Sequence, residues 1–117
     1  METLAILQGA YFLTTGIWPL FSIRTFLMVT GPKIDLWLVK TVGVTIAAIG
    51  ATLILAGARG EVSPAIVLLA VGSAGGLGAV DVIYATRKVI SPVYLLDAVV
   101  EAVLVIWWGV LVMQRWL

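Results

Sequence analysis

The sequence predicts an all-α membrane protein whose four transmembrane helices form an up-and-down bundle, a single domain over residues 1–117. Of the 117 residues, 62% are hydrophobic and 11% are charged, whereas about a quarter of the residues of a soluble domain are charged. The apolar residues fall into long runs, each near the ~20 residues that a helix needs to cross a bilayer. A net charge of +1 provides no basic face for nucleic acid, so the expected partner is the lipid bilayer.

The chain has no cysteine and no histidine. This excludes disulfides, thiol chemistry, histidine-dependent catalytic triads and the usual zinc and haem ligands. We therefore expect no metal and no cofactor, and any chemistry must come from carboxylates, lysine, arginine, tyrosine or hydroxyl groups.

The first helix is predicted over Leu4–Phe21. An acid and no basic residue precede its apolar run, and no small-residue cleavage site follows, so we interpret it as a retained helix and not as a signal peptide. Pro19 is expected to kink or end it. A semi-polar stripe at helical spacing should face the other helices, where polar groups find partners: Gln8, Tyr11, Thr15 and Trp18.

The next stretch, FSIRTFLMVTGPKIDLW, predicts a short amphipathic segment at the membrane interface, closed by a turn at Gly31 and Pro32. The second helix is predicted over Asp35–Ala56. A stripe of small residues on it is typical of close helix packing: Gly43, Ala47 and Ala51.

Two Ser-Pro pairs predict the starts of the last two helices, because serine caps a helix and proline fits its first turn. The third helix should begin at Ser63 and Pro64 and continue to about Lys88, and the fourth should run from Ser91-Pro92 to about Trp116. The glycine-dense string VGSAGGLGA in the third helix predicts close packing against another helix. It contains no GxGxxG match and follows no strand, so it is not a dinucleotide site.

Basic residues predict how the bundle is oriented. The first and third turns share one side of the membrane, and most of the positive charge lies there: Arg24, Lys33, Arg87 and Lys88, with Lys40 close by. The other side carries only Arg59 and Arg115. The positive-inside rule then places both turns in the cytoplasm and both termini outside.

Acidic side chains near the third turn predict a polar site. Asp97 and Glu101 are four residues apart and share a helix face, while Asp81 reaches a similar depth on the preceding helix. A rise of 1.5 Å per residue places Asp97 ~9 Å and Glu101 ~15 Å inside the fourth helix, the latter near the midplane of a ~30 Å core. The candidate ligand- or ion-binding residues are these acids and the polar groups around them: Glu101, Asp97, Asp81, Tyr94, Tyr84, Lys40, Arg24 and Arg87.

An ionised carboxylate at mid-bilayer costs at least ~2.5 kcal/mol unless something compensates it. Three arrangements would do so: an ion pair with a nearby basic residue (Lys40, Arg24 or Arg87), a proton on one acid, or a bound cation or polar ligand. A charge network that only locks the helices together is the alternative. It fits Asp81, which is near the interface, as well as a functional role does, whereas the depth of Glu101 favours function.

Two strings, GIWPLFSIRTFLMVTGPKIDLWLVKTVG and DVIYATRKVISPVYLLDAVVE, resemble those of uncharacterised small four-helix proteins of the bacterial inner membrane. These are similar in size and layout to the DoxX-like families and, more distantly, to the EXPERA four-helix domain. The DoxX resemblance implies an accessory subunit of a membrane oxidoreductase. The EXPERA resemblance implies a lipid or sterol pocket lined by acids and aromatic residues, in some members with isomerase activity. That isomerase pattern uses a histidine, which the chain lacks, and no catalytic residue carries over. Small multidrug exporters are not covered, since the first helix has no membrane-embedded glutamate.

Three functions remain open. The first is binding or passing a proton, a cation or a small polar or lipidic ligand at the acids, with a homodimer formed through the glycine-rich faces of the second and third helices. The second is an accessory or structural subunit of a larger membrane complex. The third is a small intramembrane acid–base enzyme acting on a lipidic substrate, which no nucleophile–base pair or cofactor motif supports, so no catalytic residue is assigned.

Overall fold

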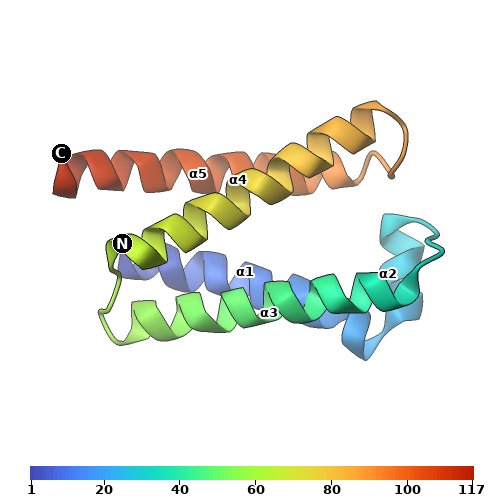
Figure 1. Ribbon diagram of the computed structural model, residues 1–117, viewed down its shortest axis with the longest axis horizontal. Helices are drawn as coiled ribbons and strands as arrows, with labels where there is room; N and C mark the ends of the chain where they lie inside the picture. The colour runs from blue at the N-terminus through green and yellow to red at the C-terminus, as the bar shows by residue number, and fades with distance from the viewer.

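The computed structural model describes residues 1–117 as five helices. Four of them are long and apolar enough to cross a membrane: α1 (Glu2–Phe21), α3 (Leu36–Ala58), α4 (Pro64–Thr86) and α5 (Tyr94–Trp116). The predicted all-α bundle of four membrane-spanning helices is therefore confirmed. The short α2 (Ile23–Thr30) lies between α1 and α3, where the sequence predicts an amphipathic segment. Both termini lie at one end of the bundle with the α3–α4 turn, and α2 and the α4–α5 turn lie at the other end (Figure 1).

Glycines bring the backbones of α1 and α3 into direct contact. A Cβ atom built on Gly16 would lie 2.5 Å from the backbone nitrogen of Ala47, and one on Gly50 would lie 2.5 Å from that of Leu13. The contact repeats along the antiparallel pair at glycines spaced seven residues apart on each helix: Gly9, Gly16, Gly43, Gly50 and Gly57. The glycine face of α3 is thus covered by α1, so its predicted role in a homodimer is wrong. Ala51, which the sequence places in the packed stripe, is exposed.

The glycines of α4 behave differently. A Cβ atom on any of the three at its centre would meet nothing within 4 Å: Gly72, Gly75 and Gly76. Only Gly78 faces a neighbour, because its Cβ atom would lie 3.1 Å from the Cβ of Glu101 on α5. Among the glycines of this stretch, only Gly78 packs closely within the chain, although Ala74 between them is also buried.

Three of the sequence predictions concern the ends of α1 and α4. Pro19 does not end α1, which continues to Phe21. Ser63 caps α4 as predicted, since its Oγ accepts the backbone N–H of Ile66 at 3.3 Å. The helix ends at Thr86, two residues earlier than expected, and Lys88 adopts a left-handed conformation with φ of 62°.

The second Ser-Pro pair does not start a helix. Ser91 Oγ accepts the N–H of Val93, only two residues on, at 3.3 Å. The amides of Tyr94 and the two residues after it donate to carbonyls three residues back, at 2.9 to 3.1 Å, which is the spacing of a tight turn rather than an α-helix. The α5 helix therefore begins at Tyr94, and Asp97 lies in its first turn, ~4.5 Å from the helix start and not the expected ~9 Å.

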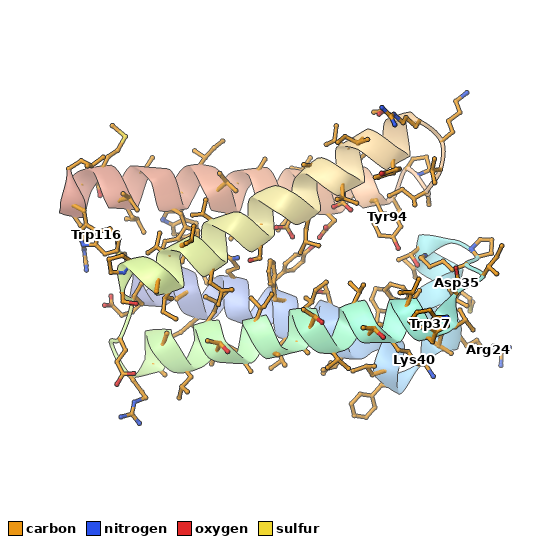
Figure 2. All side chains as sticks on the ribbon, viewed as in Figure 1. Arg24, Asp35, Trp37, Lys40, Tyr94 and Trp116 are labelled. Atoms are coloured by element: carbon orange, nitrogen blue, oxygen red, sulfur yellow. The ribbon has the colours of Figure 1, made fainter.

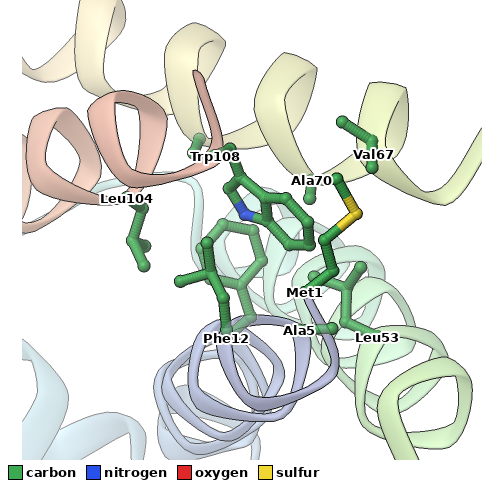
Figure 3. Packing of buried hydrophobic residues seen from close by; sticks show 10 residues of the cluster. Met1, Ala5, Phe12, Leu53, Val67, Ala70, Leu104 and Trp108 are labelled. Atoms are coloured by element: carbon green, nitrogen blue, oxygen red, sulfur yellow. The ribbon is translucent and has the colours of Figure 1, made fainter. Parts of the chain in front are cut away.

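The core lies at the end of the bundle that holds the termini. Trp108 of α5 is fully buried there against Phe12 of α1 and residues of α3 and α4 (Figure 3). Gln8 is also fully buried, and both ends of its amide are bonded: Nε2 donates to the carbonyl of Ala70 at 2.9 Å, and Oε1 accepts from Trp108 Nε1 at 2.7 Å. One side chain of α1 thereby connects α4 and α5, as expected for a polar residue that faces other helices.

Candidate functional site

A cavity of about 470 Å³ lies between the α1–α3 pair and the α4–α5 pair, toward the end of the bundle that carries α2. Fourteen of its 22 lining residues are hydrophobic, so most of its wall is compatible with hydrocarbon. The lining side chains that carry a polar or charged group come from α1, α2, α4, α5 and the loop after α2: Tyr11, Thr15, Trp18, Thr30, Lys33, Asp81, Tyr94, Asp97 and Glu101.

The deep wall of the cavity carries two buried acids, each with one oxygen that has no hydrogen-bond partner. Glu101 on α5 is 2% exposed and Asp81 on α4 is 6% exposed. One oxygen of each, Glu101 Oε2 and Asp81 Oδ2, is buried and accepts no hydrogen bond. Gly78 allows this arrangement, because a side chain at that position would press against Glu101 where α4 and α5 pass each other. Buried polar atoms are normally satisfied, so these oxygens distinguish the site from the rest of the core.

Asp97 is the third acid of the cavity and is bonded. It is half-buried in the first turn of α5, and its Oδ1 accepts a hydrogen bond from the Tyr11 hydroxyl of α1. This bond crosses from one helical pair to the other inside the cavity. Asp97 is therefore fixed by the fold, in contrast to the free oxygens of Asp81 and Glu101.

Of the three ways to compensate these acids, ion pairs with Arg24, Lys40 or Arg87 are not formed. Arg24, Lys40 and Arg87 are exposed, and none lies within ion-pair distance of an acid. Arg24 and Lys40 extend outward at the α2 end of the bundle (Figure 2). The one pair between side chains in the chain joins Arg59 to Glu61 at 3.1 Å, in the loop at the opposite end. The flexible side chains of Arg24, Lys40 and Arg87 place their charges in water at a lower free-energy cost than beside the buried acids.

Lys33 is the cation that does line the cavity. Its Nζ donates to the hydroxyl of Thr30 at 2.8 Å and to the carbonyl of Gly31 at 3.2 Å. The same Nζ lies 5.2 Å from the ring centre of Phe26 and 5.1 Å from that of Tyr94, within the range of cation–π attraction. Lys33 is thus held at the mouth by α2 and α5, and it forms no ion pair with the acids.

The structure brings together half of the residues that the sequence nominates: Asp81, Tyr94, Asp97 and Glu101 all line the cavity. Tyr84 does not, because it is 41% exposed on α4. Sequence reasoning missed Tyr11 as a partner of an acid, and it used Lys33 only to orient the bundle. A signal for Tyr11 was present, since it belongs to the semi-polar stripe of the first helix. No pattern in the sequence marked Lys33.

The cavity opens sideways between α3 and α4. Leu38 and Val42 of α3 and Val80 of α4 line it, yet they are 43%, 49% and 50% exposed. Side chains that are both exposed and part of the wall mark an opening, and these three lie on helices that can cross a membrane. The opening therefore lies between two helices that are long and apolar enough to cross a membrane.

No group of three acidic side chains is arranged to hold a metal ion. The chain matches no protein-family model, no curated protein and no solved structure among those with which it was compared. The resemblance to DoxX-like and EXPERA-like proteins stays a prediction.

Proposed function

We propose that this membrane protein binds a small amphiphile from the bilayer, with a positively charged, hydrogen-bond-donating head at Asp81 and Glu101 and a hydrocarbon tail along the apolar wall. The observation that carries the proposal is Glu101, which is 2% exposed in the wall of an open cavity with a carboxylate oxygen that has no partner. A buried acceptor without a hydrogen bond costs about 1–3 kcal/mol of folding free energy. A ligand that donates a hydrogen bond to it recovers that free energy.

The shape and polarity of the cavity support this ligand class. Its volume of about 470 Å³ falls within the ~300–1,000 Å³ typical of small-molecule sites. The lateral opening at Val42 and Val80 would admit a tail directly from the lipid. The donors of Tyr11 and Lys33 are already engaged, so the oxygens that remain free at the deep wall are acceptors. An anionic carboxylate head has no proton to donate to these oxygens.

The test uses three probes with one tail and different heads: dodecylamine, dodecanol and dodecanoate. The protein is held in lipid nanodiscs, and binding is followed by the shift of the unfolding temperature, since a ligand that binds only the folded state stabilises it by mass action. We expect stabilisation by dodecylamine, less by dodecanol and none by dodecanoate.

The Glu101→Gln variant should weaken dodecylamine binding by about tenfold or more, because a hydrogen bond to a charged group is worth about 1.5–3 kcal/mol. Glu61→Gln is the matched control, because Glu61 is exposed in the α3–α4 loop. Equal binding of the three heads, or unchanged dodecylamine binding to Glu101→Gln, would refute the proposal.

A second candidate is an accessory subunit that packs against other membrane helices. The observation in its favour is the open glycine face of α4 at Gly72, Gly75 and Gly76, which no helix of the chain covers, since such faces let backbones approach closely in lipid. Native mass spectrometry after extraction in mild detergent would detect a partner, and Gly75→Leu should release it. A monomer in both samples would exclude this role.

We also propose that α2 and the α4–α5 turn lie on the cytoplasmic side of a bacterial plasma membrane, with both termini outside. The support is the excess of lysine and arginine at that end of the bundle. Single cysteines at Arg87 and Arg59, at opposite ends of the bundle, would report the orientation in whole cells through a membrane-impermeant thiol reagent. Labelling of Arg87→Cys from outside would reverse it.

A further inference from the structure

A second cavity adjoins the first at the loop end of the bundle. It has a volume of about 660 Å³ and lies between the α2–α3 loop and the α4–α5 loop. Its wall is more polar than that of the site cavity, with Asp35, Lys88 and Ser91 among its residues. Five residues line both cavities: Thr30, Lys33, Leu38, Val39 and Ile90. We call this second cavity the vestibule.

Lys33 lies where the vestibule meets the site cavity. Its Nζ has three acceptors, which are the carbonyl of Thr30 at 3.4 Å, the hydroxyl of Thr30 at 2.8 Å and the carbonyl of Gly31 at 3.2 Å. It also contacts the rings of Phe26 on α2 and Tyr94 on α5. The side chain therefore joins the two sides of the passage, one carried by the α1–α3 pair and the other by the α4–α5 pair.

We propose that the site cavity has a second, aqueous entrance through the vestibule and that Lys33 closes it. When Lys33 leaves the rings of Phe26 and Tyr94, its ammonium can reach water at the loop end, as long lysine side chains do at membrane interfaces. The vestibule and the site cavity then become continuous, and water and small cations reach Glu101 without crossing lipid. The lateral opening between α3 and α4 serves apolar groups, and this entrance serves polar ones.

The inference stands on the two cavities and the contacts of Lys33, and it does not depend on which amphiphile the site binds. Its test exploits the absence of cysteine from the chain. Leu77 lines the site cavity from α4 and is part-buried, so Leu77→Cys places one thiol inside while leaving the acids intact. The probe is a positively charged, membrane-impermeant methanethiosulfonate, added to either side of proteoliposomes.

We expect Leu77→Cys to react slowly, and only when the reagent is added from one side. That side is the one from which the reagent labels an Arg87→Cys control variant and does not label an Arg59→Cys control variant. Adding Lys33→Met should raise the rate by about fivefold to tenfold, because it removes cation–π contacts with two rings and bonds to three acceptors. Tyr94→Leu should act in the same direction, whereas Tyr94→Phe keeps the ring and should leave the rate unchanged.

Lys40→Met is the control for loss of a lysine, since Lys40 is exposed and lines neither cavity. If Lys33→Met leaves the labelling rate unchanged while the protein elutes as a folded species, the gate is refuted. Labelling from the Arg59 side would refute the entrance itself. Neither result bears on dodecylamine binding, so failure of this inference and failure of the proposed ligand can be told apart.

Discussion

The two ends of the bundle each bury a polar side chain, and they treat it in opposite ways. At the end that holds the termini, which we call the closed end, Gln8 is fully buried and both halves of its amide have partners on other helices. At the open end, Glu101 is nearly as buried, yet one of its oxygens has none. A polar residue that only fastens helices together satisfies its hydrogen bonds inside the protein. By this comparison Gln8 serves the fold, whereas Glu101 fits the ligand-binding role that we propose.

The largest effect should come from breaking the closed end at its centre. Trp108→Ala removes a fully buried indole and the donor to Gln8 Oε1, and truncations of buried aromatic residues cost about 3–5 kcal/mol. Unfolding in mixed micelles titrated with sodium dodecyl sulfate would measure it. The neighbouring Trp107→Ala is the control, because Trp107 is 41% exposed. If both variants lost the same stability, Trp108 would not be the centre of the core.

A smaller loss is expected for Gln8→Leu. Leucine is apolar and of similar size, but it leaves Trp108 Nε1 buried without an acceptor, at a cost of about 1–3 kcal/mol. The same titration would measure the free energy of unfolding, and Thr14→Leu is the control on α1, where Thr14 is exposed. A neutral or stabilising result would mean that Gln8 does not fasten the helices, and the contrast with Glu101 would disappear.

The smallest effect, with the opposite sign, is expected for Glu101→Gln in the absence of ligand. The amide replaces a buried carboxyl group that has one oxygen without a partner, so the free energy of unfolding should stay within about 1 kcal/mol of the parent or rise. The measurement is again unfolding by sodium dodecyl sulfate, without dodecylamine, and Glu61→Gln is the control. A loss as large as that of Gln8→Leu would show that Glu101 is a structural residue, and the proposed role of the open end would lose its support.

Much of the fold could be predicted because lipid restricts backbone conformation so strongly. An apolar run of about 20 residues has almost no alternative to a helix in a bilayer, so the spans and the short α2 follow from composition and turns. The start of α5 was less predictable. Ser91 does not cap α5, because its Oγ accepts the N–H of Val93 in a tight turn that precedes the helix start at Tyr94. Local signals alone do not distinguish that turn from the true cap at Ser63.

The candidate site was predictable in its acids and not in their surroundings. Charge inside an apolar run is a strong signal, and it correctly led to Asp81 and Glu101 as buried residues. Their basic partners were nominated because they belong to the same end of the bundle, which overlooked how far a lysine or arginine can turn toward water. The exposed Lys40 and Arg87 illustrate that error, and Lys33 illustrates its converse.

The amino-acid sequence by itself determined that this chain forms four apolar helices with acids near one turn, because hydrophobicity and helical spacing are properties of neighbouring residues. Only the tertiary structure decided which glycines pack against a neighbouring helix and which acid accepts the hydrogen bond of Tyr11. It also decided which carboxylate oxygens have no partner. Those outcomes depend on how α1–α3 and α4–α5 pack against each other at one end and separate at the other. That geometry arises from contacts between residues far apart in the chain, such as Gln8 with Trp108.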